Sequence, residues 1–421
     1  MAALVIGIGG LLLKQPWMDN ISLAAWFTVM MVYLGDGGLE LFRQFSEWRE
    51  VNLKIQYAGS QGRTFDLRPQ REYVLARRGQ GTTIYPAFPR GLLLRSGADT
   101  PTETVLRGDD GTSLLPLGSI SNVLTVRGNE TGEYLVYSSD EHGFHNPPDI
   151  WSLPRLKIAA VGDSFVQGES VRSESNMIAI IRARVPATLN LGHGGNGPLS
   201  ELATILEYLP QRRPEIVLWV FCEENDIQED LEREKRSDLM MGYLETPARI
   251  QRLDRRQPEI DEKLRRYFEL QLNSSDTERS SGSRLRNWLA LHELAFAVSA
   301  FRNPPPEDFA LFHRVLAAAK NAVSSWNGSL LLVYLPVQGN IKPGSFGLGP
   351  RSSARRTREH VLQICSALAI PVLDLEKRFA EEPSRRRDYF YPYHAHFTEK
   401  GYRRAGELVL DELQKQRLLG R

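Results

Sequence analysis

The sequence predicts an α/β protein whose main domain, residues 151–421, is built on an open, doubly wound parallel β-sheet. Three observations predict this fold class. Short runs of apolar residues alternate with helical patterns along this part of the chain. The runs are apolar at consecutive positions, as is typical of strands that are covered on both faces. Strand, helix and strand then repeat in order, which favours parallel strands joined by helical crossovers.

The first 45 residues predict a membrane anchor of one or two helices. Residues 1–13 and 20–35 carry no charge and are apolar on every face, whereas a surface helix would show one apolar stripe. Each segment is shorter than the roughly 20 residues that span a bilayer comfortably. We expect residues 14–19, which include Pro16, to form the turn of a helical hairpin. A pair of buried core helices is the alternative.

Residues 46–150 predict a small β-rich accessory region. Four short runs are interpreted as strands because they alternate in polarity and are separated by Gly, Asp or Asn. These runs are LKIQY, REYVLAR, VLTVRG and EYLVYS. The segment HNPPDIWSLP then predicts an extended linker. Asn129-Glu130-Thr131 matches an N-glycosylation triplet, which we interpret as a chance match.

The main domain contains five predicted strands and five predicted helices. The strands are KIAAVGDS, ATLNLG, EIVLWVFC, SLLLVYLP and IPVLDL; the helices are MIAIIRAR, LSELATILEYLPQRR, DFALFHRVLAAAKNAVSSW, RTREHVLQICSALA and the final TEKGYRRAGELVLDELQKQRL. Thr398 is placed to cap the last helix. Residues 229–305, between the third and fourth strands, form a charged insert with opposite charges at i,i+4 spacing. That spacing predicts a solvated helical excursion.

The composition is that of an ordinary globular protein. The chain has 421 residues, of which 42% are hydrophobic and 24% are charged. Its formal net charge of +1 gives no electrostatic reason to expect nucleic acid as a partner. Cys222 and Cys365 lie in apolar patterns, so we expect two buried thiols and neither a disulfide framework nor a metal site.

Polar residues that can carry chemistry follow the predicted strands at one edge of the sheet. Ser164 follows the first strand, the glycine-rich turn NLGHGGNG (190–197) follows the second, and EEND (223–226) follows the third. His394 and His396 precede the last helix. In such sheets, ligands bind beyond the carboxyl ends of the strands. A hydroxyl, an imidazole, an amide and backbone donors are the groups that acyl transfer requires.

These residues and their order resemble the SGNH, or GDSL-type, serine hydrolase family. The four motif blocks of the family occur in order across about residues 137–421. The segment YSSDEHGFHNPP before the first strand is similar to the lead-in of the family's membrane-anchored bacterial members. The resemblance implies a three-layer, flavodoxin-like hydrolase domain with esterase activity and without a metal or organic cofactor.

The resemblance also implies a role for each matching residue. Ser164 would be the nucleophile, and His396 would be the general base and then the general acid. The backbone N–H groups of Ser164 and Gly195 and the side-chain amide of Asn225 would bind the oxyanion. Asp163 would brace the turn that presents Ser164.

The chain departs from the family pattern beside the expected base. The family carries an acid two or three residues before the catalytic histidine, where this chain has His394 and Tyr393. Absence of that acid would weaken catalysis by up to ~10⁴. A backbone carbonyl or Asp388 would then have to orient His396.

Further residues are candidates for lining the pocket or orienting the base. Glu223 stands where the family has a glycine, and its carboxylate would either repel anionic substrates or point to solvent. His193, in the glycine-rich turn, would line the pocket or lie on a surface loop. Asp163 and His394 belong to the same group of candidates.

Together, these patterns predict a membrane-anchored serine esterase. We expect it to hydrolyse O-acyl esters, most simply O-acetyl groups on a cell-surface glycan, with its catalytic domain on the extracytoplasmic side. One alternative is a catalytically weak or inactive protein that binds or helps to assemble polysaccharide. Others are a glycan O-acetyltransferase and a lipid esterase or thioesterase. The expected partners are the ester substrate and the membrane.

Overall fold

The computed structural model describes most of the chain. The described residues are 15–88, 106–246, 250–273, 291, 294, 308–336, 351–382 and 388–419, without the side chains of residues 15–19 and 351–355. The chain divides into two compact units, one comprising residues 1–51 and 274–304 and the other residues 52–273 and 305–421.

A five-stranded parallel sheet forms the centre of the second unit. Its strands are β6 (Ile158–Val161), β7 (Thr188–Asn190), β8 (Ile216–Cys222), β9 (Ser329–Leu335) and β10 (Val372–Asp374). They lie in the order β10-β9-β8-β6-β7, and every neighbouring pair is parallel. In chain order this is 2-1-3-4-5, the order of flavodoxin-like doubly wound folds. The predicted fold class and all five predicted strands are confirmed.

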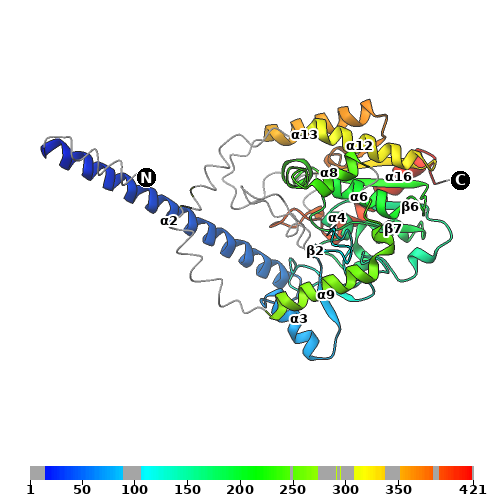
Figure 1. Cartoon of the computed structure of the whole chain (residues 1–421), viewed down its shortest axis with the longest axis horizontal. Coiled ribbons are helices and arrows are strands. Elements are labelled where there is room, and N and C mark those ends of the chain that lie inside the picture. Colours follow the sequence, from blue (N-terminus) through cyan, green and yellow to red (C-terminus); the bar gives the residue numbers. More distant parts are fainter. Residues whose placement is uncertain are drawn as a thin grey trace. The chain divides into compact units, whose positions relative to one another are not determined.

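Helices cover both faces of the sheet because successive strand side chains point to opposite sides. One face packs against α6 (Pro198–Tyr208), α12 (Phe309–Ser324) and α13 (Arg351–Ala367), and the other against α5 (Met177–Arg182), α14 (Leu375–Ala380) and α16 (Glu399–Lys415) (Figure 1). Alternate residues of β8 show the division, since Trp219 belongs to the first apolar core and Val220 to the second. Cys222 and Cys365 are buried, free thiols, as expected.

The N-terminal part of the described chain is one helix, α2 (Gln15–Ser60), and this corrects two expectations. Residues 15–19 are helical, so they do not form the predicted hairpin turn; Pro16 is tolerated there because it lies in the first turn. The expected helix over 1–13 lies outside the described residues. LKIQY, predicted as a strand, belongs to α2. Arg43 pairs with Glu40 and Glu47 at i−3 and i+4 and favours the helix.

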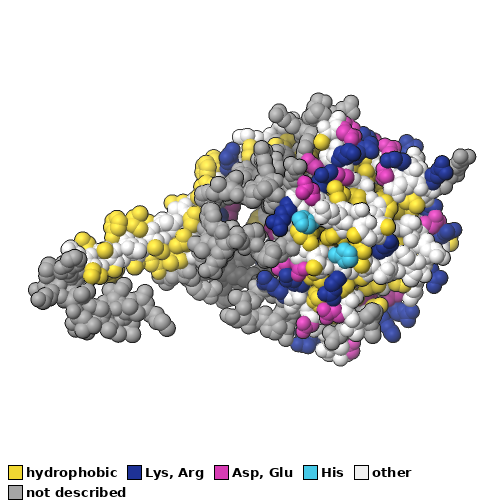
Figure 2. Space-filling model, turned by 90° about the horizontal axis from the view of Figure 1, so that it is seen from above, with side chains coloured by type: hydrophobic (Ala, Val, Ile, Leu, Met, Phe, Trp, Pro, Cys, Tyr) yellow, Lys and Arg dark blue, Asp and Glu magenta, His cyan; other side chains and the backbone are white. Residues whose placement is uncertain are grey.

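Helix α2 exposes an unusual number of large apolar side chains. Leu23, Trp26 and Leu41 are 71%, 75% and 69% exposed. Figure 2 shows apolar side chains over the part of α2 that is not drawn in grey. Within the described residues, α2 is the helix whose length and composition would allow it to cross a membrane, and an N-terminal signal sequence would have the same properties.

The accessory region contains helices as well as strands. REYVLAR, predicted as a strand, lies in α3 (Gln70–Gly79). A segment of about five to seven residues is too short for the alternation of polar and apolar residues to distinguish a helix from a strand. VLTVRG and EYLVYS do contain strands. The strands of this region are β1 (Ile84–Pro86), β4 (Leu124–Val126) and β5 (Val136–Ser138) in one sheet, with β2 (Leu106–Arg107) and β3 (Ser113–Leu114) in a second.

The described part of the charged insert is largely helical, as predicted, but its helices are not simply solvated. It contains the α-helices α7 (Glu232–Glu234), α8 (Asp238–Glu245) and α9 (Gln257–Asn273). Helix α9 buries Ile260, Leu264 and Phe268, and its Asp261 accepts hydrogen bonds from the backbone and hydroxyl of Ser121. The charged residues of α9 thus alternate with an apolar stripe, and this stripe packs the insert against the accessory region.

Short elements complete the described structure. They are η2 (Ile150–Ser152), α4 (Ser164–Gln167), η3 (Ser173–Ser175), the π-helix η4 (Asp226–Leu231) and η6 (Leu253–Arg255). Thr398 caps α16 as predicted, because its hydroxyl accepts a hydrogen bond from the N–H of Gly401 at 3.3 Å.

Candidate functional site

Ser164 lies at the carboxyl end of β6, where the buried strand turns into α4. Asp163 is the N-cap of this helix, and its carboxylate accepts a hydrogen bond from the N–H of Phe165 at 2.9 Å. The turn is closely packed, because a Cβ on Gly162 would lie 2.4 Å from Val166. A strand that is buried at every position and a capped turn therefore fix the serine hydroxyl at the edge of the sheet.

The hydroxyl of Ser164 meets the imidazole of His396. The distance from Oγ to Nε2 is 2.8 Å, although the two residues are 232 positions apart in the chain. His396 belongs to the segment that leads into α16, and its ring packs against that of Phe165 at 5.0 Å between centroids. The structure thus brings together the two residues that the sequence predicts as nucleophile and base.

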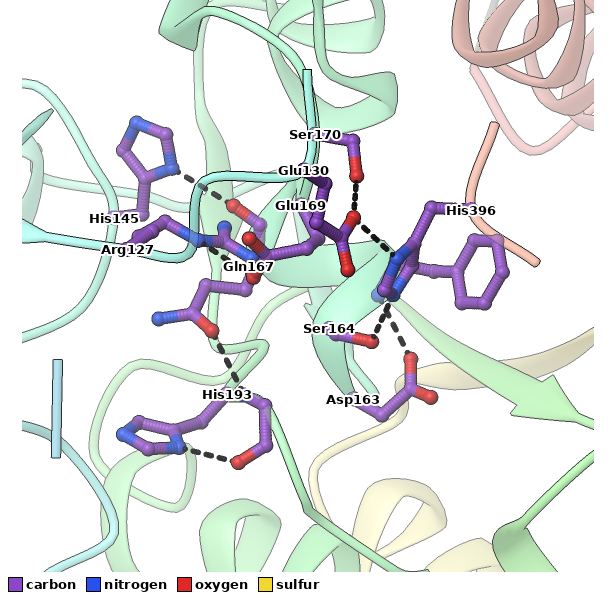
Figure 3. A network of polar contacts seen from close by, with 12 residues as sticks. Arg127, Glu130, His145, Asp163, Ser164, Gln167, Glu169, Ser170, His193 and His396 are labelled. Carbon is purple, nitrogen blue, oxygen red and sulfur yellow. Dashed lines mark hydrogen bonds and ion pairs between the residues drawn. The ribbon is translucent and has the colours of Figure 1, made fainter. Parts of the chain in front are cut away.

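The acid beside His396 comes from the accessory region and was missed by the sequence analysis. Glu130 lies between β4 and β5, and its Oε2 is 2.9 Å from Nδ1 of His396 (Figure 3). An ionised carboxylate can only accept, so the ring donates through Nδ1; when the ring is neutral, its Nε2 is left to accept from Ser164. Glu130 therefore orients the imidazole and fixes the tautomer of its neutral form.

Asp388, the acid expected to reach His396, does not do so. Its carboxylate is largely exposed and pairs with Lys400 at 3.1 Å, while its backbone oxygen accepts from the hydroxyl of Thr398 at 2.6 Å. The expectation that a backbone carbonyl orients the ring is also wrong, because Nδ1 faces Glu130. Asp388 instead fixes the start of α16.

The loop that carries Glu130 is held by the chain that follows helix α2. Asn129 donates from its side chain to the carbonyl of Asp66 at 2.7 Å, and the N–H of Asp66 donates to the carbonyl of Gly132 at 2.7 Å. Gly132 has φ +113° and lies against Ala58, where an added Cβ would be 3.0 Å from the alanine Cβ. Only glycine adopts this backbone readily, so the loop has one favoured course.

Two further side chains converge on Oε2 of Glu130. The hydroxyl of Ser170 donates to it, and Ser170 has a left-handed backbone with φ +67°. Nε2 of His394 lies 3.5 Å from the same oxygen. Arg127, three residues before Glu130, pairs with Glu169 next to Ser170. The accessory region and the turn after α4 are thus joined by two neighbouring polar contacts.

The electrostatics of the pair favour its charged form. Burial alone would lower the pKa of His396, but the charge and the hydrogen bond of Glu130 outweigh it and raise that pKa to about 9. Burial alone would raise the pKa of Glu130, but His396, then His394 and the Ser170 hydroxyl, hold that pKa well below its usual range. The site is therefore well suited to stabilise an imidazolium.

His394 is a neutral neighbour of this pair. Burial lowers the pKa of His394 to about 3. Its Nδ1 accepts a hydrogen bond from the N–H of His396 at 3.2 Å, which places the ring proton on Nε2, the atom that faces Glu130. The neutral ring therefore places an N–H 3.5 Å from the carboxylate without adding charge.

Glu130, His394 and His396 could in principle hold a metal ion, since their ligand atoms lie within 4.8 Å of one another. A histidine ligand must present a nitrogen lone pair to the metal. Nε2 of His394 carries the proton, and Nδ1 of His396 donates to Glu130. The hydrogen bonds therefore fit a proton-transfer network better than a metal centre.

The glycine-rich turn lies on the other side of Ser164. An added Cβ on Gly194 would be 3.9 Å from the Cβ of Ser164, and the N–H of Gly194 donates to the side chain of Gln167 at 2.8 Å. Gly195 follows with φ +78°. Among the described residues, neither the N–H of Gly195 nor that of Ser164 has an acceptor. Both donors remain available to a ligand in this part of the chain.

Asn225 reaches the same region from the end of β8. Its side-chain amide donates to Oδ2 of Asp230 at 2.6 Å. The amide also lies next to the carboxyl group of Asp163; burial raises the pKa of that carboxyl, against a smaller lowering by Phe165, His396 and Asn225. Asn225 therefore lies beside the turn that presents Ser164, as the sequence predicts.

Two pocket candidates are buried rather than exposed. Glu223 is 8% exposed and lies against the hydroxyl of Tyr334 on β9; burial and then this carboxylate raise the pKa of the tyrosine. The expectation that Glu223 points to solvent is therefore wrong. His193 is 2% exposed, with Nδ1 3.1 Å from the carbonyl oxygen of Gly194, so the surface-loop alternative is also wrong.

Comparisons with known proteins find similarity only at the level of structure. No family model and no curated protein matches this sequence. A lipase/acylhydrolase from Enterococcus faecalis has a TM-score of 0.37 and 15% identity over 62% of this chain and 96% of that one. The esterase EstA from Pseudoalteromonas sp. has a TM-score of 0.35 and 12% identity over 62% and 97%. The acetyl xylan esterase AlAXEase has a TM-score of 0.35 and 11% identity over 61% and 100%.

These TM-scores and identities are too low to carry a conclusion about function. The fold class rests on the strand order of this chain, and its chemistry rests on the residues around Ser164.

Proposed function

We propose that this chain is a serine esterase of the SGNH type. The observation that carries the proposal is the continuous hydrogen-bonded path from the hydroxyl of Ser164 through His396 to Glu130. Nucleophile, base and orienting acid in this order are the arrangement that activates a serine for acyl transfer. Gly195 and Asn225 lie on the opposite side of Ser164 and supply donors for the oxyanion.

The first half of the reaction forms an acyl-enzyme. Ser164 Oγ attacks the ester carbonyl carbon, and its proton passes to Nε2 of His396. Glu130 stabilises the resulting imidazolium, while the N–H groups of Ser164 and Gly195 and the amide of Asn225 receive the charge on the carbonyl oxygen. The bond from carbon to the alcohol oxygen then breaks. The alcohol leaves with the proton from Nε2, and the acyl group stays on Oγ.

The second half releases the acid. A water molecule gives a proton to Nε2 of His396 and attacks the acyl carbon. The bond from carbon to Ser164 Oγ breaks, and Oγ recovers the proton from Nε2. No group other than water enters and no electron is transferred, so the side chains of the site supply all the proton transfers that hydrolysis requires.

The non-catalytic alternative loses its main support. It depended on the absence of an acid beside the base, and Glu130 lies at hydrogen-bonding distance from His396. The raised pKa of His396 is the expected consequence of that pairing. A binding protein that no longer catalyses would have no need for a paired, buried imidazole and carboxylate.

We propose further that α2 anchors the enzyme in a membrane and that its substrate is an O-acyl ester, in the simplest case O-acetyl, on a glycan of the extracytoplasmic side. The exposed apolar side chains of α2 support the anchor. The substrate follows from the motif resemblance and from anchoring rather than from a particular residue of the pocket.

The direct test is labelling and hydrolysis by the full chain in detergent. The wild type should react with a fluorophosphonate probe and hydrolyse p-nitrophenyl acetate. Ser164→Ala should lose labelling and at least about 10⁴ of kcat, whereas Ser152→Ala, at an exposed turn, should lose neither. A wild-type chain that is folded but inert to both reagents would refute the proposal.

Sidedness and acyl preference need separate measurements. A membrane-impermeant fluorophosphonate should label Ser164 in intact cells as strongly as in permeabilised cells. Labelling only after permeabilisation would place the site in the cytoplasm. A preference for octanoyl over acetyl esters would favour a lipid esterase, and transfer of the acyl group to an added sugar in place of water would indicate an acetyltransferase.

A further inference from the structure

Two charged residues lie behind the proposed oxyanion donors. We propose that Asp230 and Arg233 are positioning residues that hold Asn225 and Gly195 in the geometry the oxyanion requires. This inference rests on the proposed esterase function and adds to it a part of the site that none of the motif blocks contains.

An ion pair joins the two donors. Oδ2 of Asp230 accepts from the amide of Asn225 at 2.6 Å, and the same amide lies beside the carboxyl group of Asp163. Nη2 of Arg233 donates to Oδ1 of Asp230 and, at 3.0 Å, to the carbonyl oxygen of Gly195. The same guanidinium therefore contacts the carboxylate that holds Asn225 and the glycine that presents the second N–H.

The backbone explains why these residues meet. Asn225 is the N-cap of the π-helix η4, and its carbonyl accepts from the N–H of Asp230, five residues later, at 2.9 Å. The wider turn of a π-helix places residues 225 and 230 beside each other, and such turns are frequent at functional sites. Arg233 lies three residues further on, at the spacing of helical side-chain pairs. An added Cβ on Gly197 would be 2.6 Å from the Cβ of Asp230, so the glycine-rich turn packs directly on this helix.

Pairing with Arg233 also neutralises the charge of Asp230 near the proposed oxyanion donors. An unpaired carboxylate next to Asn225 would oppose the negative charge of the transition state. Burial, together with Glu234 and Asp163, outweighs the opposing effect of Arg233 and raises the pKa of Asp230 to about 7. With Arg233 bound, Asp230 can orient the amide while the pair adds no net charge.

The first test is the effect of Asp230 on kcat and KM. Asp230→Ala should lower kcat by about 10- to 100-fold, less than loss of the donor itself, with KM within about twofold because the ground-state ester needs little from the oxyanion donors. Asp230→Asn, which keeps an oxygen for Asn225, should lose less than about fivefold. In an Asn225→Ala background, Asp230→Ala should cost less than about threefold, since it acts through the missing amide.

The second test exploits the charge balance. At alkaline pH, where Asp230 is ionised even without its partner, Arg233→Met should lower kcat by about 10- to 100-fold because it leaves that carboxylate uncompensated beside the oxyanion. Adding Asp230→Asn should restore at least about tenfold of that loss, a rescue that a structural role for Arg233 would not produce. Glu232→Gln, on the same helix and paired with Lys235, should leave kcat unchanged.

The outcomes separate this inference from the proposed function. If Ser164→Ala abolishes activity while every folded Asp230 and Arg233 variant keeps wild-type kcat, the inference is wrong and the esterase assignment stands. An undiminished loss from Asp230→Ala in the Asn225→Ala background, or an Arg233→Met loss without rescue, would also overturn it. A folded wild type that hydrolyses no ester would refute both this inference and the proposed esterase function.

Discussion

The two sides of Ser164 are assembled in different ways. On the oxyanion side, Gly195 follows β7, and Asn225 and Asp230 follow β8; these are the two strands that flank β6 in the sheet. On the base side, Glu130 and His396 are 266 residues apart, and the acid belongs to a region outside the sheet. The comparison teaches that the proposed oxyanion donors follow strands of the sheet, whereas the acid paired with His396 comes from a distant segment of the chain.

The first prediction concerns the acid and carries the largest expected effect in this comparison. Glu130→Ala should lower kcat by about 10³- to 10⁴-fold, because an unpaired His396 would lose its tautomer and the partner of its imidazolium. The measurement is p-nitrophenyl acetate hydrolysis by the full chain. Glu133→Ala is the matched control, since Glu133 lies in the same loop but is exposed and contacts Arg63 and Arg172. Equal activities for the two variants would contradict the role of Glu130 as the partner of His396.

The second prediction concerns the oxyanion side. Asn225→Ala should lower kcat by about 10²- to 10³-fold through loss of one donor. Unlike the Glu130 variants, it should leave the pH dependence of kcat/KM unchanged, because the amide does not contact His396. Asn321→Ala on α12, an exposed position, is the control. A shift of the pH profile in Asn225→Ala would show that the two sides are not separable.

The third prediction concerns the residue that holds the acid. Ser170→Ala should lower kcat by about tenfold, since a hydrogen bond to a charged group contributes about 1.5–3 kcal/mol and only part of it is felt in the transition state. Ser170→Gly would relieve the left-handed backbone yet still lose the donor, so it should lose activity to the same extent. Full activity of Ser170→Gly with low activity of Ser170→Ala would mean that the backbone, and not the hydroxyl, matters.

The smallest expected effect is that of the acid nearest in sequence to the last motif. Asp388→Asn should change kcat/KM by less than about twofold, because the side chain is exposed and pairs with Lys400. Thermal unfolding of the same variant should also change little. A tenfold loss of activity would show that Asp388, rather than Glu130, serves His396 during turnover.

Much of the fold and half of the site could be predicted from the sequence. Strands buried on both faces leave consecutive apolar residues, so the five strands of the sheet and Ser164 at the end of the first could be recognised. Gly195 and Asn225 follow strand ends for the same reason. The proposed nucleophile and oxyanion donors are thus recognisable from local sequence.

The acid could not be found in this way. Glu130 lies in a turn-rich segment, residues 129–132, whose pattern indicates only a loop. Its role depends on contacts with Ser170 and His396 in distant parts of the chain. The available signal was indirect: a histidine in the position of the usual acid implies that a carboxylate must come from elsewhere. The helical state of LKIQY and REYVLAR was missed because these segments are too short for their period to be decisive.

The most direct test of the central claim is the pH dependence of kcat/KM for the wild type and for Glu130→Gln. The rate of Ser164→Ala at each pH is subtracted as the background. The base must be neutral to accept the proton of Ser164, so activity should rise with pH through the pKa of His396, which Glu130 raises to about 9. In Glu130→Gln the ion pair is gone, and burial lowers the pKa of the ring against the smaller raising effects of Glu169 and Asp163. The rise should therefore move to a lower pH than in the wild type, with a lower plateau. An unchanged midpoint in Glu130→Gln would contradict the pairing of Glu130 with His396.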